Sequence, residues 1–171
     1  MSVKKEDIGF IGAGLMGHGM AKNILAAGYR LSVIAHSNRA PIDALVNQGA
    51  IEAATLADLA ANSSIIHICA PGSPQVEAIV AALLPVMQPG TVVVDCSTSD
   101  PNSTVSLAAK LEASGFHMAD APLGGTPVQA EAGGLSTMIG APEAIFERIK
   151  PVIAAWASAI VHIGPSGSGH K

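Results

Sequence analysis

Three glycines near the start of the chain constrain its fold more than any other feature of the sequence. Gly12, Gly14 and Gly17 have the spacing G-x-G-x-x-G and follow a short apolar run, residues 8–11. A helix-compatible segment comes next and ends at Gly28. A strand, a tight glycine turn and the start of a helix are together the parts that hold a pyrophosphate. The pattern therefore predicts a dinucleotide site, and the alternative is a glycine-rich turn that binds nothing.

Each of the three glycines has a separate expected role. Gly12 permits the tight turn, and Gly14 lets the backbone approach the phosphates. Gly17 lets the helix and the strand lie close together. The start of the helix offers unpaired N–H groups and the positive end of its dipole.

Apolar runs of strand length alternate with helix-like segments along the whole chain. Runs such as residues 65–68 and 92–94 are nearly all apolar, which is typical of strands buried on both faces. Repeated βα units predict an α/β fold, namely a doubly wound, mainly parallel Rossmann-type sheet with helices on both faces. The expected strands cover residues 7–12, 30–35, 64–70, 91–95, 116–121, 135–139 and 159–163. The expected helices cover residues 14–27, 40–48, 56–61, 74–87, 101–114 and 142–155.

Composition limits the classes of function that need to be considered. The 171 residues are 49% hydrophobic and 13% charged, which indicates a globular domain rather than a disordered chain. The apolar runs are broken by proline and glycine, so none is expected to span a bilayer. The N-terminus has no signal-peptide pattern, which predicts a cytoplasmic protein. The net charge is −4 and no block of Lys and Arg is present, which argues against nucleic acid as a partner.

The cysteine and histidine content gives no sign of a metal site. Cys69 and Cys96 each end an apolar, strand-like run, and we expect two reduced core thiols. There is no C-x-x-C pair and no Cys/His cluster. His67 lies in the middle of an expected strand and is interpreted as a core residue. No histidine has an evident partner for acid–base chemistry.

The residues after the second expected strand bear on which dinucleotide is bound. NAD sites usually place an acid about 20 residues after the glycine motif, to bind the ribose 2′-hydroxyl. Here the segment contains Ser37, Asn38 and Arg39, and the next acid is Asp43, inside the following helix. Arg39 could pair with a 2′-phosphate, with Ser37 and Asn38 as further donors, so the pattern favours NADP over NAD. The alternative is that Arg39 is a solvated residue at the start of a helix.

Four motifs in this order resemble those of the β-hydroxyacid dehydrogenases, the family of 3-hydroxyisobutyrate dehydrogenase and tartronate semialdehyde reductase. The first is the glycine motif with its flanking residues, and the second, Asp-Cys-Ser-Thr, is similar to the substrate-side motif of the family. The third is similar to the segment Asp-Ala-Pro-Val-Ser-Gly-Gly, and the fourth to the loop before the catalytic lysine. The motifs occupy residues 9–17, 95–98, 120–125 and 164–170.

The resemblance implies roles for particular residues. Those that would contact the coenzyme diphosphate are Gly12, Gly14, Leu15, Met16 and Gly17. Those that would line the adenosine and ribose side are Ala70, Pro71 and Gln75, while Thr98 would lie near the nicotinamide. Those that would help to hold the substrate are Ser97, Gly124 and Gly125. The alternative for Ser97 and Thr98 is that they are strand-end hydroxyls bonded to nearby backbone.

The sequence departs from the family pattern in two places. Where the family usually has Ser-Gly-Gly, this chain has Gly124-Gly125-Thr126, so we expect a substrate other than 3-hydroxyisobutyrate. The catalytic lysine of the family would fall just beyond Lys171. No catalytic residue is therefore expected in the chain, and Lys171 is interpreted as a loop or first-turn residue.

The resemblance also implies how the chain is organised and what the complete protein does. Residues 1–163 would form an NAD(P)-binding Rossmann domain, and residues 164–171 would begin a linker to a helical C-terminal domain that this chain lacks. The complete protein would be a homo-oligomer that transfers a hydride between the nicotinamide and a small 3-hydroxy acid or its oxo counterpart. The alternative is a stand-alone dinucleotide-binding module without turnover.

Overall fold

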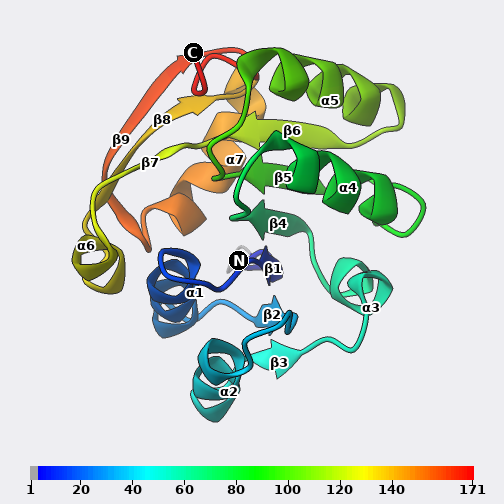
Figure 1. Cartoon of the computed structure of the whole chain (residues 1–171). Coiled ribbons are helices and arrows are strands. Elements are labelled where there is room, and N and C mark those ends of the chain that lie inside the picture. Colours follow the sequence, from blue (N-terminus) through cyan, green and yellow to red (C-terminus); the bar gives the residue numbers. More distant parts are fainter. Residues whose placement is uncertain (1–3) are drawn as a thin grey trace.

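The computed structural model describes residues 4–171, which form one mixed sheet with helices on both faces (Figure 1). The strands are β1 (Ile8–Ile11), β2 (Leu31–Val33), β3 (Ile51–Glu52), β4 (Ile65–Ile68), β5 (Val92–Asp95), β6 (His117–Asp120), β7 (Leu123–Gly124), β8 (Leu135–Gly140) and β9 (Ala157–Gly164). The helices are α1 (Gly17–Ala26), α2 (Ala40–Asn47), α3 (Leu56–Ala61), α4 (Ser73–Leu83), α5 (Pro101–Ala113), α6 (Pro127–Glu131) and α7 (Glu143–Ile153).

The strand order identifies the edge of the sheet where a ligand is expected. The order is β3-β2-β1-β4-β5-β6-β8-β7, and β9 pairs with β8. From β1 the chain first moves outward to β2 and β3, and then crosses to β4 and continues to β5 and β6. The direction of winding therefore reverses between β1 and β4. Such a reversal opens a crevice at the carboxyl ends of the strands.

The six strands from β3 to β6 are parallel, which confirms the expected doubly wound, mainly parallel sheet. Ile8 of β1 lies between Leu31 of β2 and Ile65 of β4, and the register holds along the strands. Beyond β6 the sheet is mixed, since β8 is antiparallel to both β6 and β7 and parallel to β9.

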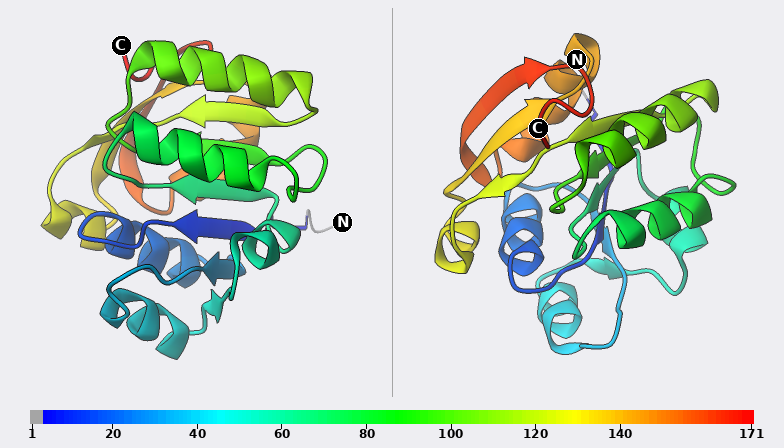
Figure 2. Two further views of the ribbon diagram at one scale, coloured as in Figure 1. Left: turned by 45° about the vertical axis from the view of Figure 1, so that its right-hand side comes forward. Right: turned by 45° about the horizontal axis from the view of Figure 1, so that its top comes forward.

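Two helix layers cover the sheet, and alternation along the strands supplies a core to each (Figure 2). Phe10 belongs to the core under α1, α2 and α7, while its neighbour Ile11 belongs to the core under α3, α4 and α5. Both faces of the central strands are thus buried, which explains why their sequences are nearly all apolar.

Three short elements were not expected from the sequence. β3 and β7 have two residues each, and both residues of β3 are exposed, so neither carries a strand-like apolar pattern. Helix α6 has five residues but begins with a capping box, in which Thr126 and Gln129 exchange hydrogen bonds between side chain and backbone. The spacing Thr-x-x-Gln is a recognised sign of a helix start and could have revealed it.

Several helix and strand boundaries differ from the expected ones for local reasons. Helix α1 begins at Gly17 rather than residue 14, because residues 14–16 form the turn. Helix α4 ends at Leu83, two residues before a proline, and Pro142 is the cap of α7 rather than its first residue, with φ −55° and ψ 144°. The last strand is longer than expected, at Ala157–Gly164.

His67 is a core residue, as expected. Its ring is fully buried, stacks on Phe10 with 5.6 Å between ring centroids, and accepts a 3.3 Å hydrogen bond from the indole N–H of Trp156. Burial lowers the pKa of His67 to about 3, so the imidazole is neutral at neutral pH. Cys69 and Cys96 are both free thiols, and burial raises the pKa of Cys69 to about 11.

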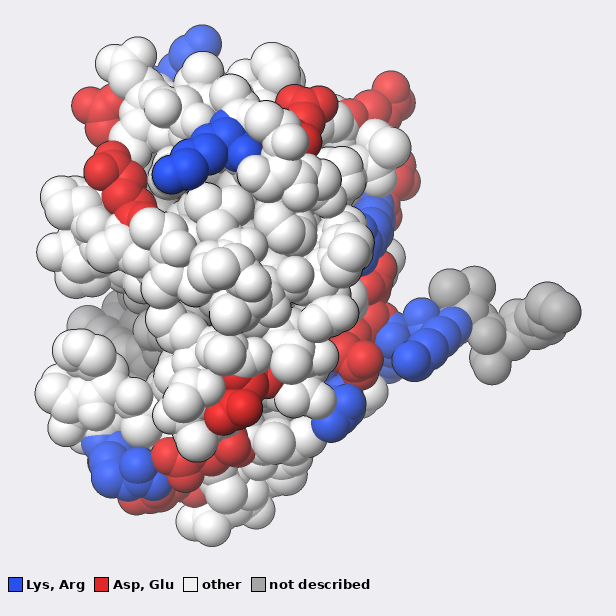
Figure 3. Space-filling view, turned by 90° about the vertical axis from the view of Figure 1, so that its right-hand side faces the viewer, with Lys and Arg blue, Asp and Glu red and all other residues white. Residues whose placement is uncertain are grey.

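The surface carries few charges. On the face shown in Figure 3, Lys and Arg side chains are scattered and several lie beside acidic ones, so they form no continuous basic patch there. Within residues 4–171, none of the helices combines the length and the apolar character that a membrane span requires.

Candidate functional site

The loops that follow β1, β4 and β5 meet at the carboxyl edge of the sheet. A Cβ atom added to Gly12 would lie 2.0 Å from the carbonyl oxygen of Cys69, so the first two loops are in direct contact. A Cβ atom on Gly72 would lie 3.6 Å from the carbonyl oxygen of Thr98, which brings the third loop alongside. The structure therefore gathers three groups of residues that the sequence had assigned to one site.

The glycine turn after β1 has the geometry that its spacing predicts. Gly12 has φ +98°, which side chains rarely adopt, and its Cβ position is blocked by backbone. A Cβ atom on Gly17 would lie 2.0 Å from the carbonyl oxygen of Gly12, so turn and helix pack without room for a side chain. Gly14 differs, since no atom of residues 4–171 lies within 4 Å of its Cβ position. The backbone at Gly14 therefore faces open space.

The start of α1 is arranged to receive an anion. Met16 occupies the cap position, no side chain bonds to the amides of the first turn, and that turn contains no acidic residue. Leu15, just before it, is 79% exposed. Unpaired N–H groups at the positive end of a helix dipole bind phosphates. These residues thus fit the diphosphate of a dinucleotide.

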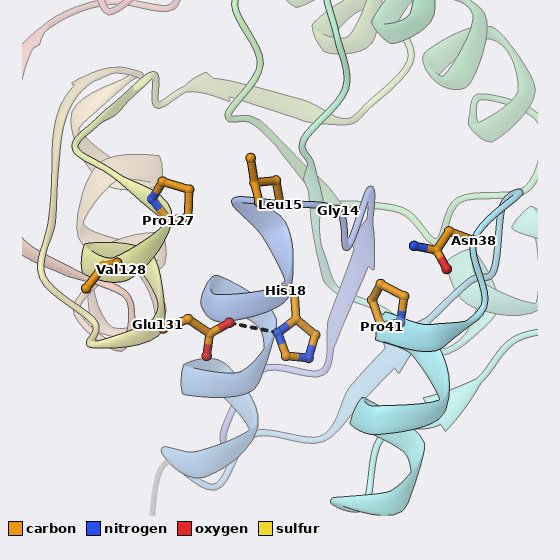
Figure 4. Close-up of a pocket in the computed structure, with 8 residues that line it drawn as sticks. All are labelled: Gly14, Leu15, His18, Asn38, Pro41, Pro127, Val128 and Glu131. Atoms are coloured by element: carbon orange, nitrogen blue, oxygen red, sulfur yellow. Dashed lines mark hydrogen bonds and ion pairs between the residues drawn. The ribbon is translucent and has the colours of Figure 1, made fainter.

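A cleft of about 550 Å³ extends from the glycine turn toward α2 and α6 (Figure 4). Three parts of the chain form its walls: the glycine turn with α1, the start of α2, and α6. Its lining residues are Gly14, Leu15, His18, Asn38, Pro41, Pro127, Val128 and Glu131.

An ion-pair cluster closes the α6 side of the cleft. The Nδ1 atom of His18 lies 2.8 Å from the Oε1 atom of Glu131, and Lys22 contacts the other carboxylate oxygen. Hydrogen bonds from Lys22 and then His18 lower the pKa of Glu131. His18 therefore has a carboxylate partner, which the sequence did not reveal because the two residues are 113 positions apart.

The loop after β2 holds the three residues that were expected beside the adenosine ribose. Asn38 accepts a 3.2 Å hydrogen bond from the N–H of Ala40 through Oδ1, and its amide nitrogen points into the cleft (Figure 4). Ser37 is hydrogen-bonded to His36 at 3.3 Å. Arg39 is exposed at the start of α2, and its guanidinium group forms ion pairs with Glu52 and Asp43.

Hydrogen bonds from Asp95 and Ser97 shape the loop after β5. The carboxylate of Asp95 is fully buried and accepts from the N–H of Ser97 at 2.9 Å and from the hydroxyl of Ser99 at 2.7 Å. The hydroxyl of Ser97 accepts a 2.8 Å hydrogen bond from the N–H of Ala70. Ser97 therefore links the ends of β4 and β5, next to Thr98.

Gly124 and Gly125 lie in and just after β7, on the α6 side of the site. Gly124 pairs with Ser136 of β8, and Gly125 has φ +136°. The next residue, Thr126, caps α6, and its hydroxyl accepts a 3.3 Å hydrogen bond from the N–H of Gln129.

The loop after β9 is fastened to the same edge of the sheet. The buried carboxylate of Asp120 accepts hydrogen bonds from the N–H groups of Gly167 at 2.6 Å and His170 at 2.8 Å. The ring of His170 lies 2.8 Å from the hydroxyl of Thr104 and 3.0 Å from the carbonyl oxygen of Ser97. Lys171 follows as an exposed residue.

These features define a class of protein. A parallel sheet that reverses its winding at β1 and β4, with a glycine turn and an uncapped helix start at that point, is a Rossmann-type dinucleotide-binding domain. The chain belongs to the family described as the NAD binding domain of 6-phosphogluconate dehydrogenase, whose model matches residues 7–164. It is thus a nicotinamide-coenzyme-binding domain.

Similar proteins are hydroxyacid dehydrogenases and related enzymes. The 2-(hydroxymethyl)glutarate dehydrogenase of Eubacterium barkeri is 39% identical over 97% of this chain and 56% of its own length. The NAD-dependent L-serine dehydrogenase of Pseudomonas aeruginosa is 36% identical over 96% of this chain and 56% of its own length. The crystal structure of 3-hydroxyisobutyrate dehydrogenase from Salmonella typhimurium superposes with a TM-score of 0.91 at 31% identity, covering 97% of this chain and 59% of that one. The chain spans about half the length of the curated relatives that it matches.

Proposed function

We propose that this chain is the coenzyme-binding part of an oxidoreductase that transfers a hydride between a nicotinamide coenzyme and a small 3-hydroxy acid, or the matching oxo acid. The observation that carries the proposal is the uncapped start of α1, reached through Gly14, whose Cβ position faces open space. The named activities of the similar proteins support the class of substrate.

The residues of the chain would bind and orient the coenzyme, which supplies the hydride chemistry when bound. Amides of the turn and of the first helical turn would hold the diphosphate; the residues concerned are Gly12, Gly14, Leu15, Met16 and Gly17. Ala70, Pro71 and Gln75 would line the adenosine and ribose side, and Thr98 would lie near the nicotinamide ring.

The substrate would be held by Ser97, Gly124 and Gly125. Because the hydroxyl of Ser97 accepts a hydrogen bond from the N–H of Ala70 and donates to the carbonyl oxygen of Ile68 at 3.5 Å, its part would be to fix the loop beside the substrate. The glycine pair carries no side chains of its own, and backbone N–H donors in such a turn suit the carboxylate of a hydroxy acid.

For the coenzyme we infer that NADP is preferred over NAD. The support is the loop after β2, which has Ser37, Asn38 and Arg39 and no acid at the end of the strand. The amide nitrogen of Asn38 points into the cleft beside Gly14, where a ribose 2′-phosphate would need donors.

We also propose a domain organisation, an oligomeric state and a location for the complete protein. Residues 1–163 are the NAD(P)-binding domain, and residues 164–171 begin the connection to a helical domain that carries the catalytic lysine just beyond Lys171. The complete protein is a homo-oligomer and is located in the cytoplasm, where Cys69 and Cys96 stay reduced.

Replacement of Gly14 by valine tests the proposed site. The Cβ atom of the added side chain would have no atom of residues 4–171 within 4 Å, so the fold should be kept, but the side chain would occupy the space needed by the phosphates. We expect wild-type chain to bind NADPH in a fluorescence titration and Gly14→Val to bind at least about 100-fold more weakly, which is about 2.7 kcal/mol.

The exposed Ala113 at the far end of α5 provides the matched control, because Ala113→Val adds the same kind of side chain away from the cleft. Circular dichroism would check that both variants fold. Unchanged affinity in folded Gly14→Val would overturn the assignment of the diphosphate site.

A further inference from the structure

The guanidinium group of Arg39 is held by two carboxylates rather than presented freely to the cleft. Nη1 donates to Oε1 of Glu52 at 2.9 Å, and Nη2 donates to Oε2 of Glu52 at 3.1 Å. Nη2 also donates to Oδ1 of Asp43 at 3.1 Å. Three of the five N–H donors of the arginine are therefore in use.

The pattern of these three bonds matters for a phosphate ligand. A guanidinium group binds phosphate best through two parallel N–H groups, either Nη1 with Nη2 or Nε with Nη2. Glu52 takes the first of these edges completely, and Asp43 takes the Nη2 donor of the second. What remains is the Nε–H and one Nη1–H, which do not form a two-pronged edge.

The net charge of the cluster of Arg39, Glu52 and Asp43 also disfavours a phosphate ligand. One arginine and two carboxylates sum to a net charge of −1, and a ribose 2′-phosphate brings about −2 near neutral pH. The hydrogen bond from Arg39 lowers the pKa of Glu52, so the carboxylate stays ionised at neutral pH.

The position of the cluster puts it where the coenzyme ribose is expected. Arg39 caps α2 directly after the β2 loop, next to Asn38, which lines the cleft with Gly14. Glu52 is the last residue of β3, which pairs with β2 through Val33 (Figure 1). The two-residue strand β3 thus places the carboxylate of Glu52 beside the end of β2.

We propose that Glu52, assisted by Asp43, limits the NADP preference of this domain by occupying the guanidinium group of Arg39 and so weakening its contact with a 2′-phosphate. The inference rests on the proposed function, because it concerns the ribose end of the proposed coenzyme site. The acid that limits NADP binding is therefore Glu52 on β3. It is not at the end of β2, where NAD sites usually have their acid. Glu52 is a specificity-determining residue that acts through Arg39.

The variant Glu52→Gln tests this directly, because it keeps the shape of the side chain and removes the charge. Dissociation constants for NADP and NAD would be measured by calorimetry at low and high salt. We expect NADP to bind about tenfold more tightly at low salt, less so at high salt, with NAD unchanged within about twofold. Glu112→Gln on the exposed end of α5 is the control, since it changes the net charge equally far from the cleft.

A double-mutant cycle separates action through Arg39 from general repulsion. In an Arg39→Gln background, Glu52→Gln should leave NADP affinity unchanged within about twofold, because there is no guanidinium group to release. A gain that persists in that background would overturn the inference in favour of simple repulsion. Unchanged or weaker NADP binding by Glu52→Gln itself would also overturn it.

Failure of the proposed function would look different. If wild-type chain bound neither NAD nor NADP, the coenzyme site itself would be wrong. If both coenzymes bound and their ratio did not respond to Glu52→Gln, only the role of Glu52 would be wrong.

Discussion

His67 illustrates at the scale of single residues how burial sets chemistry. The sequence places a titratable ring within a run of isoleucines. The fold stacks this ring on Phe10 and packs Trp156 edge-on against it, with no hydrogen-bond partner for Nδ1 among the described residues. The pKa falls to about 3 because the charged form would lose its hydration. The imidazole is therefore a neutral core group and not an acid–base catalyst.

This burial predicts a pH dependence of stability. The unfolded chain takes up a proton near pH 6.5, whereas folded His67 does so only near pH 3, so acidification through this range favours unfolding. When the pH is lowered from 7 to 5, His67 alone should decrease the free energy of unfolding by about 2 kcal/mol. In His67→Gln the amide oxygen can still accept from Trp156. Urea denaturation at pH 7 and pH 5 should show that this variant loses about 2 kcal/mol less unfolding free energy than the wild type. An equal loss in both proteins would contradict the assignment.

Two ion pairs between residues distant in the sequence could not be predicted from the sequence. Arg39 and Glu52 are 13 residues apart, and His18 and Glu131 are 113 apart, so neither pair follows a helix or strand repeat. Each depends on where the fold brings distant segments. The glycine turn, by contrast, is set by local backbone geometry. The spacing of its glycines was therefore sufficient to predict the turn from the sequence.

Helix α6 shows at the scale of elements what a five-residue helix needs in order to form. It has too few turns to be stable alone, so its capping box and its packing on α1 support it. Asn23 of α1 donates to the carbonyl oxygens of Ala130 and Glu131 at 2.9 and 3.1 Å. A Cβ atom on Gly19 would lie 2.6 Å from the backbone of Ala130, so the two helices touch through backbone.

Loss of the cap should loosen this helix measurably. Thr126→Ala removes the hydroxyl that accepts from the N–H of Gln129, and we expect a cost of about 1 kcal/mol. Amide hydrogen exchange at residues 129–131 should accelerate about fivefold. Thr126→Ser keeps an acceptor and should behave like wild type; equal exchange in the alanine and serine variants would show that packing alone maintains α6.

Elements with a strong apolar pattern were predictable, including the short α3 and β2, whereas β3, β7 and α6 were not. The run Val92–Val94 has an apolar character that only a doubly buried strand requires, and the strand is found there. Ile51 and Glu52 are both exposed and carry no such pattern, so β3 follows from pairing with β2 rather than from its own sequence. That omission also concealed the partner of Arg39.

At the scale of the whole molecule, the loops after β1, β4 and β5 meet at one edge of the sheet. We predict that residues 1–171 bind coenzyme but do not transfer hydride to or from small 3-hydroxy acids. A spectrophotometric assay of NADPH formation with such acids would check this, with Lys171→Gln as the comparison. Turnover that depends on Lys171 would show that the register assigned to the catalytic lysine is wrong, and coenzyme binding by a complete protein that never turns over would favour a stand-alone module.

The clasp of Glu131 on His18 and Lys22 has a consequence for how a ligand enters. These contacts and Asn23 join α6 to α1, so two of the three walls of the cleft are attached to each other. We expect the spacing of these two walls to change little on binding, so that little binding energy is spent on rearranging the protein.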